Sequence, residues 1–156
     1  MLSRIRSFIK EHNLLDINGG IVLVGLSGGA DSVSLLDVLC KLGYDCVALH
    51  CNFHLRGEES ERDESFAREF AKRKKVPYFA IDFQTASFAE KNKLSIEMAA
   101  RQLRYDWFEE MCKKLNAQAV AVAHHRDDSI ETLLMNLMRG SGIRGLVGIR
   151  PKNGYV

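Results

Sequence analysis

The stretch VGLSGGADSVSLL, residues 24–36, places small and acidic residues between two apolar runs. The run before it, Ile21 to Leu26, is short and almost wholly apolar, as expected for a strand covered on both faces. After it, apolar residues recur at helical spacing from Val33, and Asp31 or Ser32 is placed to cap a helix. The stretch therefore predicts a strand, a glycine turn and a helix.

The glycine turn has the properties of a phosphate-binding loop. Gly28 and Gly29 have no side chain to block a ligand, and the free N–H groups of a turn before a helix favour an anion. No Lys-Ser or Lys-Thr pair follows the glycines, and their spacing differs from the dinucleotide fingerprint. A capped helix without a ligand is the alternative, but serines and an aspartate beside the glycines favour a ligand.

The composition is that of one globular α/β domain. The 156 residues are 46% hydrophobic and 27% charged, and the formal net charge of +2 is too small to indicate nucleic-acid binding by itself. No apolar run reaches membrane-spanning length, and the N-terminal segment lacks a signal-peptide core, which predicts a cytoplasmic protein. The four cysteines form no Cys-x-x-Cys pair and predict neither zinc nor an oxidising compartment.

The rest of the chain alternates strand and helix patterns. We expect further strands at residues 46–51, 78–82 and 119–123, and helices at residues 61–75, 85–91, 95–115 and 128–138. Helix-length crossovers between strands predict an α/β fold with a doubly wound, parallel, Rossmann-like sheet. In such a sheet the ligand lies beyond the carboxyl ends of the strands.

Polar clusters follow three of the predicted strands at that edge. The second strand runs into HCNFHLRGEESERDE (50–64), and the fourth is followed by HHRDDSIET (124–132). In the latter, Asp128 and Glu131 share one face at the start of a helix. Two carboxylates near a phosphate loop suit Mg²⁺, although Asp128 is also placed to cap the helix.

The loop SGGADS resembles that of the PP-loop ATP pyrophosphatases, which cleave ATP between its α and β phosphates. Three longer stretches resemble the tRNA(Ile)-lysidine synthase family: HCNFHLRGEESERDE, EMAARQLRYDWF (97–108) and HHRDDSIETLLMNLMRGSGIRGLVGI (124–149). The resemblance extends from about Ile21 to Pro151 and implies a PP-loop ATPase fold of the adenine nucleotide alpha hydrolase type.

This resemblance implies roles for particular residues. The glycine loop would bind ATP through Ser27, Gly28, Gly29, Ala30, Asp31 and Ser32. The implied catalytic residues are Asp31, Asp128, Glu131 and Arg104, and Asp31 with Asp128 would bind Mg²⁺. The family often has histidine where this chain has Phe53, so that position receives no role.

The implied reaction is ATP-dependent ligation of lysine to C2 of the wobble cytidine of tRNA(Ile), through an adenylated tRNA, with release of AMP and pyrophosphate. The implied cofactors are ATP and Mg²⁺, and the implied partners are tRNA(Ile) with a CAU anticodon and free L-lysine. The resemblance implies no membrane association and is compatible with a homodimer. Family members usually continue beyond Val156, so we expect residues 1–156 to be a truncated N-terminal catalytic domain without the tRNA-binding region.

Three alternatives make different demands on the sequence. A PP-loop tRNA thiolase commonly uses paired cysteines, which are missing here. An amidotransferase-type synthetase for GMP or NAD would lack the Leu55-Arg56-Gly57 and Arg139-Gly140-Ser141-Gly142 elements. A non-enzymatic nucleotide-binding module would have little use for the acidic Asp-Asp-x-x-Glu-Thr element.

Overall fold

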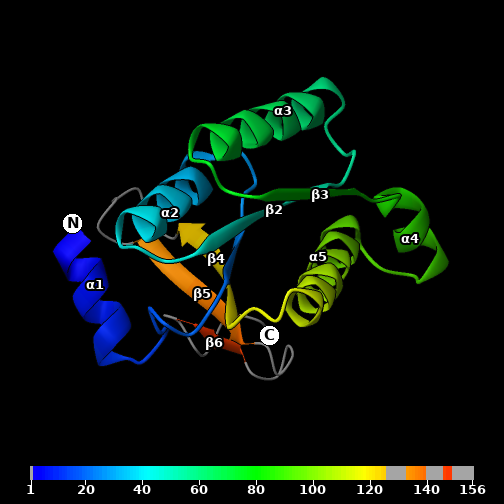
Figure 1. The fold of residues 1–156 in the computed structure, drawn as a ribbon. Helices are drawn as coiled ribbons and strands as arrows, with labels where there is room; N and C mark the ends of the chain where they lie inside the picture. The colour runs from blue at the N-terminus through cyan, green and yellow to red at the C-terminus, as the bar shows by residue number, and fades with distance from the viewer. Residues whose placement is uncertain (1, 126–132, 140–145, 149–156) are drawn as a thin grey trace.

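A computed structural model describes residues 2–125, 133–139 and 146–148 of the chain. Its centre is a twisted sheet with the strand order β3-β2-β1-β4-β5-β6 (Figure 1). The first four strands are β1 (Val22–Gly25), β2 (Cys46–Asn52), β3 (Tyr78–Asp82) and β4 (Ala119–His125). They pair in parallel, which confirms the predicted α/β fold.

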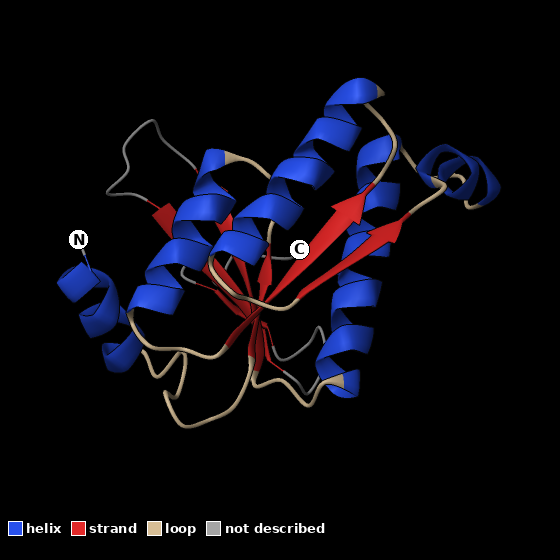
Figure 2. Cartoon of the chain, turned by 45° about the horizontal axis from the view of Figure 1, so that its top comes forward, coloured by secondary structure: helices blue, strands red, loops and turns tan. Residues whose placement is uncertain are grey.

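Helices cover both faces of the sheet (Figure 2). One face carries α1 (Leu2–Glu11), α2 (Ala30–Lys41) and α3 (Glu58–Arg73). The other face carries α5 (Ile96–Lys114), against which α4 (Thr85–Lys91) packs. No helix of the described residues is long and apolar enough to span a bilayer.

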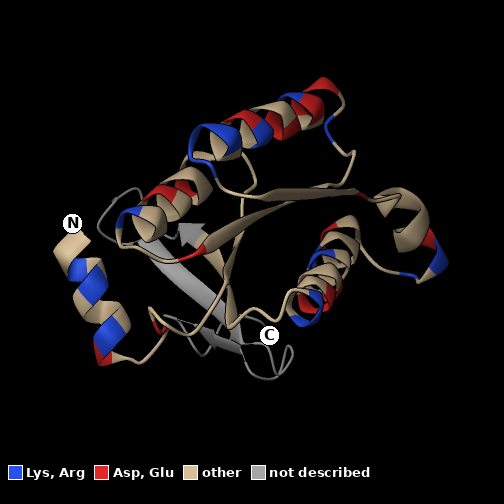
Figure 3. Ribbon diagram, in the orientation of Figure 1, with Lys and Arg blue, Asp and Glu red and all other residues tan. Residues whose placement is uncertain are grey.

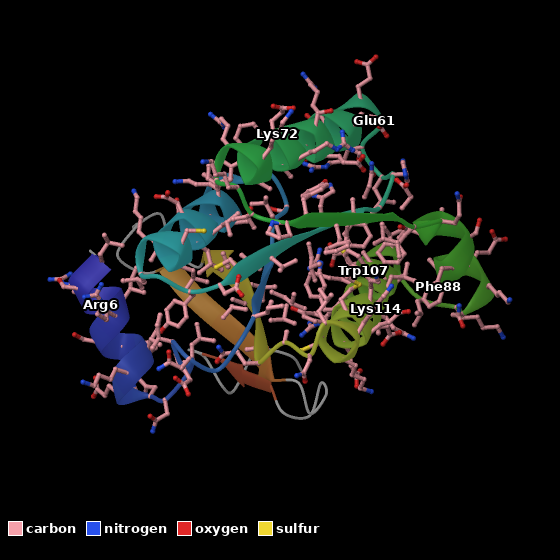
Figure 4. All side chains as sticks on the ribbon, viewed as in Figure 1. Arg6, Glu61, Lys72, Phe88, Trp107 and Lys114 are labelled. Atoms are coloured by element: carbon pink, nitrogen blue, oxygen red, sulfur yellow. The ribbon has the colours of Figure 1, made fainter. Side chains whose placement is uncertain are left out.

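The strands are apolar because helices pack on both faces of the sheet. In β2, Ala48 belongs to the apolar cluster beneath α2 and α3, whereas its neighbours Val47 and Leu49 belong to the cluster beneath α5. Trp107 of α5 lies in the layer between that helix and the sheet and is 8% exposed (Figure 4). Because successive side chains of a strand point to opposite faces, a strand covered on both must be apolar at nearly every position.

The part of the sheet beyond β4 differs from the prediction. A helix was predicted over residues 128–138, but the structure has the strand β5 at Leu133–Arg139, antiparallel to β4 and followed by the antiparallel strand β6 (Leu146–Gly148). A short run that is apolar at nearly every position, as residues 133–138 are apart from Asn136, does not distinguish a helix from a strand by its period. Pairing along the open edge of β4 supplies the backbone hydrogen bonds of the strand. Residues 126–132, where that helix was to begin, lie outside the described residues.

Candidate functional site

The loop between β1 and α2 lies at the carboxyl edge of the parallel strands, as predicted. Gly28 has a φ of +100°, a conformation that L side chains rarely adopt. A Cβ atom there would lie 3.0 Å from the backbone oxygen of Asp63 in α3. Gly29, by contrast, has a φ of −78° and would place a Cβ no closer than 3.5 Å to Ser27 Oγ. The loop therefore requires glycine at position 28, and α3 lies directly against it.

Two serines fix the shape of this loop. Ser32 Oγ accepts from the backbone N–H of Ser27 at 3.1 Å and lies 2.9 Å from the carbonyl of Gly29, to which it donates. Ser27 Oγ lies 3.1 Å from Ser32 Oγ and accepts from the N–H of Gly29 at 3.2 Å. The prediction that Asp31 or Ser32 caps the helix is wrong, because α2 begins at Ala30 with Gly29 as its N-cap and no side-chain cap. The serine hydroxyls close the turn and leave the helix end open.

That open helix end favours an anion. The first N–H groups of a helix have no partner within it, and the helix dipole places partial positive charge there. Asp31 lies in this first turn, where the negative charge of its carboxylate is favourable to the helix dipole. The placement agrees with the predicted roles of Ser27–Ser32 as an anion site and of Asp31 as a metal ligand, which stay predictions.

A hollow of about 270 Å³ opens beside the loop, and we call it the first hollow. Its lining comes from the ends of β1, β2 and β4 and from α5, with the apolar residues Leu26, Leu49, Phe108, Val122 and Ala123 along one side. Ser27 and Ser32 of the loop form its polar end. A flat apolar group with a charged tail fits this division, because the tail would lie at the helix N-terminus.

A second hollow, also about 270 Å³, lies between the end of β2 and the start of α3. Six residues line this hollow and not the first. Five of them have polar side chains, namely His50, Asn52, Arg56, Ser60 and Asp63, and the sixth is Leu55. Both hollows share four residues, namely Ser27, Cys51, Phe53 and Arg104. The loops after β1 and β2 thus meet at one place, as predicted, while the loop after β4 lies outside the described residues.

Arg104 is the cation at the boundary between the hollows. It comes from α5, and its guanidinium carbon lies 5.2 Å from the centre of the Phe53 ring. Phe53 in turn stacks on Phe83 with ring centres 5.5 Å apart. An aromatic face attracts a cation and orients it without neutralising its charge. The predicted residue Arg104 is therefore held where charge on a ligand shared by both hollows could be offset.

Buried polar groups support the second hollow. Asn52, which is 2% exposed, donates to Glu64 Oε1 at 3.2 Å and accepts from the N–H of His54 at 2.9 Å. His54 Nε2 lies 2.7 Å from Asp82 Oδ1, which connects the ends of β2 and β3. These contacts fix the loop after β2 against α3, whose N-terminal end is acidic and whose C-terminal end is basic (Figure 3).

Sequence reasoning found Arg104 and the loop but missed several wall residues. His50, Asn52 and Asp63 lie in the flagged stretch 50–64, and only the fold could tell which of its polar side chains face inward. Phe53 was given no role, yet it forms the platform beneath Arg104. Asp128 and Glu131 lie outside the described residues, so their roles stay predictions.

The cysteines offer no reactive sulfur at the hollows. Burial raises the pKa of Cys51, the cysteine that lines both hollows, to about 12. A thiol with that pKa stays protonated at neutral pH and is a poor nucleophile or sulfur carrier. Cys40 and Cys46 form a pair at the end of α2 and the start of β2, at the opposite edge of the sheet.

A glycine loop at a helix N-terminus beside a hollow, at the carboxyl edge of a parallel sheet, defines a nucleotide-binding α/β domain. Residues 2–155 match the family model described as the PP-loop domain. The chain therefore belongs to the PP-loop domain family, and this membership implies that it binds ATP.

Curated relatives cover nearly all of this chain. A tRNA(Ile)-lysidine synthase of Parabacteroides distasonis is 64% identical over 156 residues, which are 100% of this chain and 35% of the relative. Its counterpart in Bacteroides thetaiotaomicron is 55% identical over 152 residues, 97% of this chain and 35% of the relative. The chain thus spans about a third of the length of these relatives.

Solved structures share the fold. An NH3-dependent NAD synthetase from Campylobacter jejuni has a TM-score of 0.58 and 21% identity over 76% of this chain and 53% of that chain. An NMN synthetase from Francisella tularensis has a TM-score of 0.55 and 21% identity over 76% of this chain and 50% of that chain. The parallel sheet and its crossover helices are therefore an architecture found in other solved structures.

Proposed function

We propose that this chain is the ATP-binding catalytic part of a tRNA(Ile)-lysidine synthase. The observation that carries the proposal is a loop of PP-loop type, open at its helix N-terminus, beside two hollows that share Ser27 and Arg104. Relatives of that name, up to 64% identical over the whole chain, support the same activity. The substrates would be ATP, free L-lysine and tRNA(Ile) with a CAU anticodon.

The reaction needs an activated oxygen, because the C2 oxygen of cytidine is a poor leaving group. That oxygen attacks the α-phosphorus of ATP, a new oxygen–phosphorus bond forms, and pyrophosphate leaves with the electrons of the broken bond. The lysine amine then attacks C2, forms the carbon–nitrogen bond, expels AMP and loses a proton. Adenylation thus converts a poor leaving group into a good one.

The residues of the chain fit the first of these steps. The first hollow would hold the adenosine, and the loop with the α2 N-terminus would hold the departing pyrophosphate. Arg104, at the boundary of the hollows, would offset charge that develops on the α-phosphate. Donors aimed at a developing charge act without reorganising, which favours the transition state over the ground state.

The residues present also fit a magnesium ion. Within the described part of the chain no group of three His, Cys, Asp or Glu side chains could hold a metal alone. Mg²⁺ rarely needs such a group, because it binds through one or two carboxylates and the substrate phosphates. Asp31 in the first turn of α2 would be one such ligand and Asp128 the second. The bound ion would neutralise charge on the phosphates.

An alternative tRNA thiolase needs a sulfur carrier at the site. Among the residues that the structure describes, Cys51 is the only cysteine that lines the hollows, and its pKa of about 12 keeps it protonated. Ligation by an amine demands no such group. The protonation state of Cys51 therefore favours the ligase over the thiolase.

The test uses a hybrid enzyme in which residues 1–156 of this chain replace the matching segment of the Parabacteroides distasonis relative. We expect it to attach labelled lysine to tRNA(Ile) with a CAU anticodon, and to leave a tRNA(Ile) with another anticodon unmodified. A folded hybrid that binds both ATP and the tRNA but forms neither adenylated tRNA nor lysidine would contradict the proposal.

Asp128→Asn in the hybrid separates chemistry from binding. Removing the carboxylate charge keeps the side-chain shape, and losing an electrostatic group of this kind costs on the order of a hundredfold in rate. We expect tRNA binding to persist and adenylation from labelled ATP, measured without lysine, to fall by that factor. Asp127→Asn is the matched control. Unchanged adenylation with normal Mg²⁺ dependence would leave Asp31 as the sole metal ligand of the proposal.

A further inference from the structure

Cys40 and Cys46 are free cysteines on neighbouring elements at the amino edge of the sheet. Cys40 lies in the last turn of α2, and Cys46 is the first residue of β2. Between them the N–H of Gly43 donates to the carbonyl of Cys40 at 3.0 Å, and the N–H of Tyr44 donates to the carbonyl of Leu39 at 3.1 Å. Gly43 has a φ of +93°, so this turn is a Schellman motif. The motif brings the start of β2 back beside the end of α2.

The side chains of the two cysteines meet across this turn. The Cys46 thiol donates a hydrogen bond to Cys40 Sγ. Both residues pack in the apolar cluster beneath α2 and α3, where Cys46 is 4% exposed and Cys40 is partly exposed. A disulfide requires two side chains that point toward each other, and a hydrogen bond between the sulfur atoms already places them so.

Cys40 is the nucleophile of the pair. The hydrogen bond from Cys46 lowers the pKa of Cys40 to about 7, and the Lys74 ammonium acts in the same direction, whereas burial and the Asp37 carboxylate oppose it. A large share of Cys40 is therefore thiolate at neutral pH, and the thiolate is the form that peroxides oxidise. The same hydrogen bond raises the pKa of Cys46, which stays a protonated thiol beside it.

We propose that Cys40 and Cys46 form a reversible disulfide when a hydroperoxide oxidises the protein, an inference that does not depend on the proposed function. The Cys40 thiolate attacks a peroxide oxygen, a sulfur–oxygen bond forms, and the oxygen–oxygen bond breaks to give a sulfenic acid. Cys46 then attacks that sulfur, the sulfur–sulfur bond forms, and the sulfenic oxygen leaves as water. The two thiols lose two electrons and two protons, with which hydrogen peroxide becomes two molecules of water.

The surroundings favour a disulfide over other fates of a reactive thiol. A metal centre needs more ligands, and within the described part of the chain no group of three His, Cys, Asp or Glu side chains could hold one. Oxidation to the sulfinic acid needs a second peroxide, whereas the Cys46 thiol is already in contact with the sulfenic sulfur. The disulfide would fasten the end of α2 to β2, and a thiol reductant would open it again.

Peptide mass spectrometry of the hybrid enzyme tests this proposal. The reduced, folded enzyme is treated with hydrogen peroxide at neutral pH, and the remaining thiols are alkylated in denaturant. Trypsin cuts after Lys41, so the disulfide should join two peptides that are otherwise separate. The second peptide also contains Cys51, which should be found alkylated, because burial raises its pKa to about 12. Reduction before alkylation should remove the linked peptides.

Three variants assign the two steps. Cys46→Ser keeps a donor beside Cys40 but removes the second sulfur, so dimedone should trap a sulfenic acid at Cys40 and no linked peptides should form. Cys40→Ser should leave Cys46 reduced. Cys112→Ser removes a buried cysteine of another cluster and is the matched control, which should form the linked peptides as the wild type does. We expect Cys40 to be oxidised about tenfold or more faster than Cys112.

Several outcomes would overturn the inference. Cys40 that stays reduced in the folded enzyme, or that accumulates as sulfinic acid without linked peptides, would exclude the disulfide. Linked peptides that form as fast in urea as in the folded enzyme would show that the fold does not bring the sulfur atoms together. Lysidine formation enters none of these measurements, so their failure and the failure of the proposed function are distinguishable.

Discussion

Gly28 and Gly29 are adjacent residues that are glycine for different physical reasons. At Gly28 a side chain would meet both a positive φ and the backbone of Asp63, so the fold itself requires glycine. At Gly29 the backbone is ordinary and the space is open, so the fold tolerates a methyl group there. A ligand that approaches the loop amides closely is the remaining reason for glycine at position 29.

Alanine at each position separates these reasons. We expect Gly28→Ala to lower the free energy of unfolding by about 1–3 kcal/mol, since positive φ and a backbone clash both add strain. Gly29→Ala should unfold within about 0.5 kcal/mol of the wild type yet bind ATP more weakly. Urea denaturation and titration calorimetry with ATP measure the two effects. Equal loss of stability in both variants would contradict this assignment.

Cys40 has an unusual acidity for a cysteine far from the site. The thiol of Cys46 donates a hydrogen bond to its sulfur and holds the pKa of Cys40 near 7, with the Lys74 ammonium acting in the same direction. The thiolate forms above the pKa, so alkylation of Cys40 should rise with pH and level off above about pH 8. Peptide mass spectrometry after timed iodoacetamide treatment follows each cysteine separately.

The matched variant is Cys46→Ala. Without the donated hydrogen bond the pKa of Cys40 should rise, and the alkylation midpoint should move to higher pH. Cys51 and Cys112, whose pKa values are raised by burial, should stay largely unmodified over the same range. A Cys40 midpoint that Cys46→Ala leaves in place would assign the acidity to Lys74.

At the scale of elements, α5 begins with a side-chain cap that α2 lacks. Ser95 Oγ accepts from the backbone N–H of Met98 at 3.1 Å. We expect Ser95→Ala to cost about 1 kcal/mol in the free energy of unfolding, and Ser95→Asp to keep the cap and most of the stability. Urea denaturation gives both values. Indistinguishable midpoints for wild type and Ser95→Ala would mean that water replaces the cap.

The elements also mark how far sequence reasoning extends. Strand β3 and helix α4 begin and end where predicted, because Pro77 and the change of apolar period bound them. The residues of β5 were wrongly given to a helix, since Leu and Met favour helices and only pairing with β4 decides otherwise. For the site, the glycine pattern located the loop and the family resemblance pointed to Arg104. The wall of the second hollow depends on which side of β2 packs under α3, and that is a property of the fold.

At the scale of the whole molecule, residues far apart in sequence join at the edge opposite the hollows. Gln118, just before β4, donates from Nε2 to the carbonyls of Asp16 at 2.8 Å and Gly20 at 2.9 Å. Its Oε1 accepts from the N–H of Asp16 at 2.9 Å. One side chain thus connects the segment between α1 and β1 to the start of β4.

Replacing this side chain tests that connection. We expect Gln118→Ala to lower the free energy of unfolding by about 1–3 kcal/mol, because several hydrogen bonds are lost together. Gln102→Ala, at an exposed position of α5, is the control and should stay within about 0.5 kcal/mol of the wild type. Urea denaturation of both variants measures these changes. If Gln102→Ala lowered the free energy of unfolding as much as Gln118→Ala, the hydrogen bonds of Gln118 would have no particular role in stability.

The strand order has a consequence for the chain as it is synthesised. β1 lies between β2 and β4, and its Val22 pairs with Cys46 on one side and with Ala119 on the other. The first partner emerges from the ribosome soon after β1, but the second follows some seventy residues later, and ribosomes add about 5–20 residues per second. For several seconds β1 therefore has β2 on one side and an unpaired apolar edge on the other, so a nascent chain paused before residue 119 is expected to be prone to aggregation.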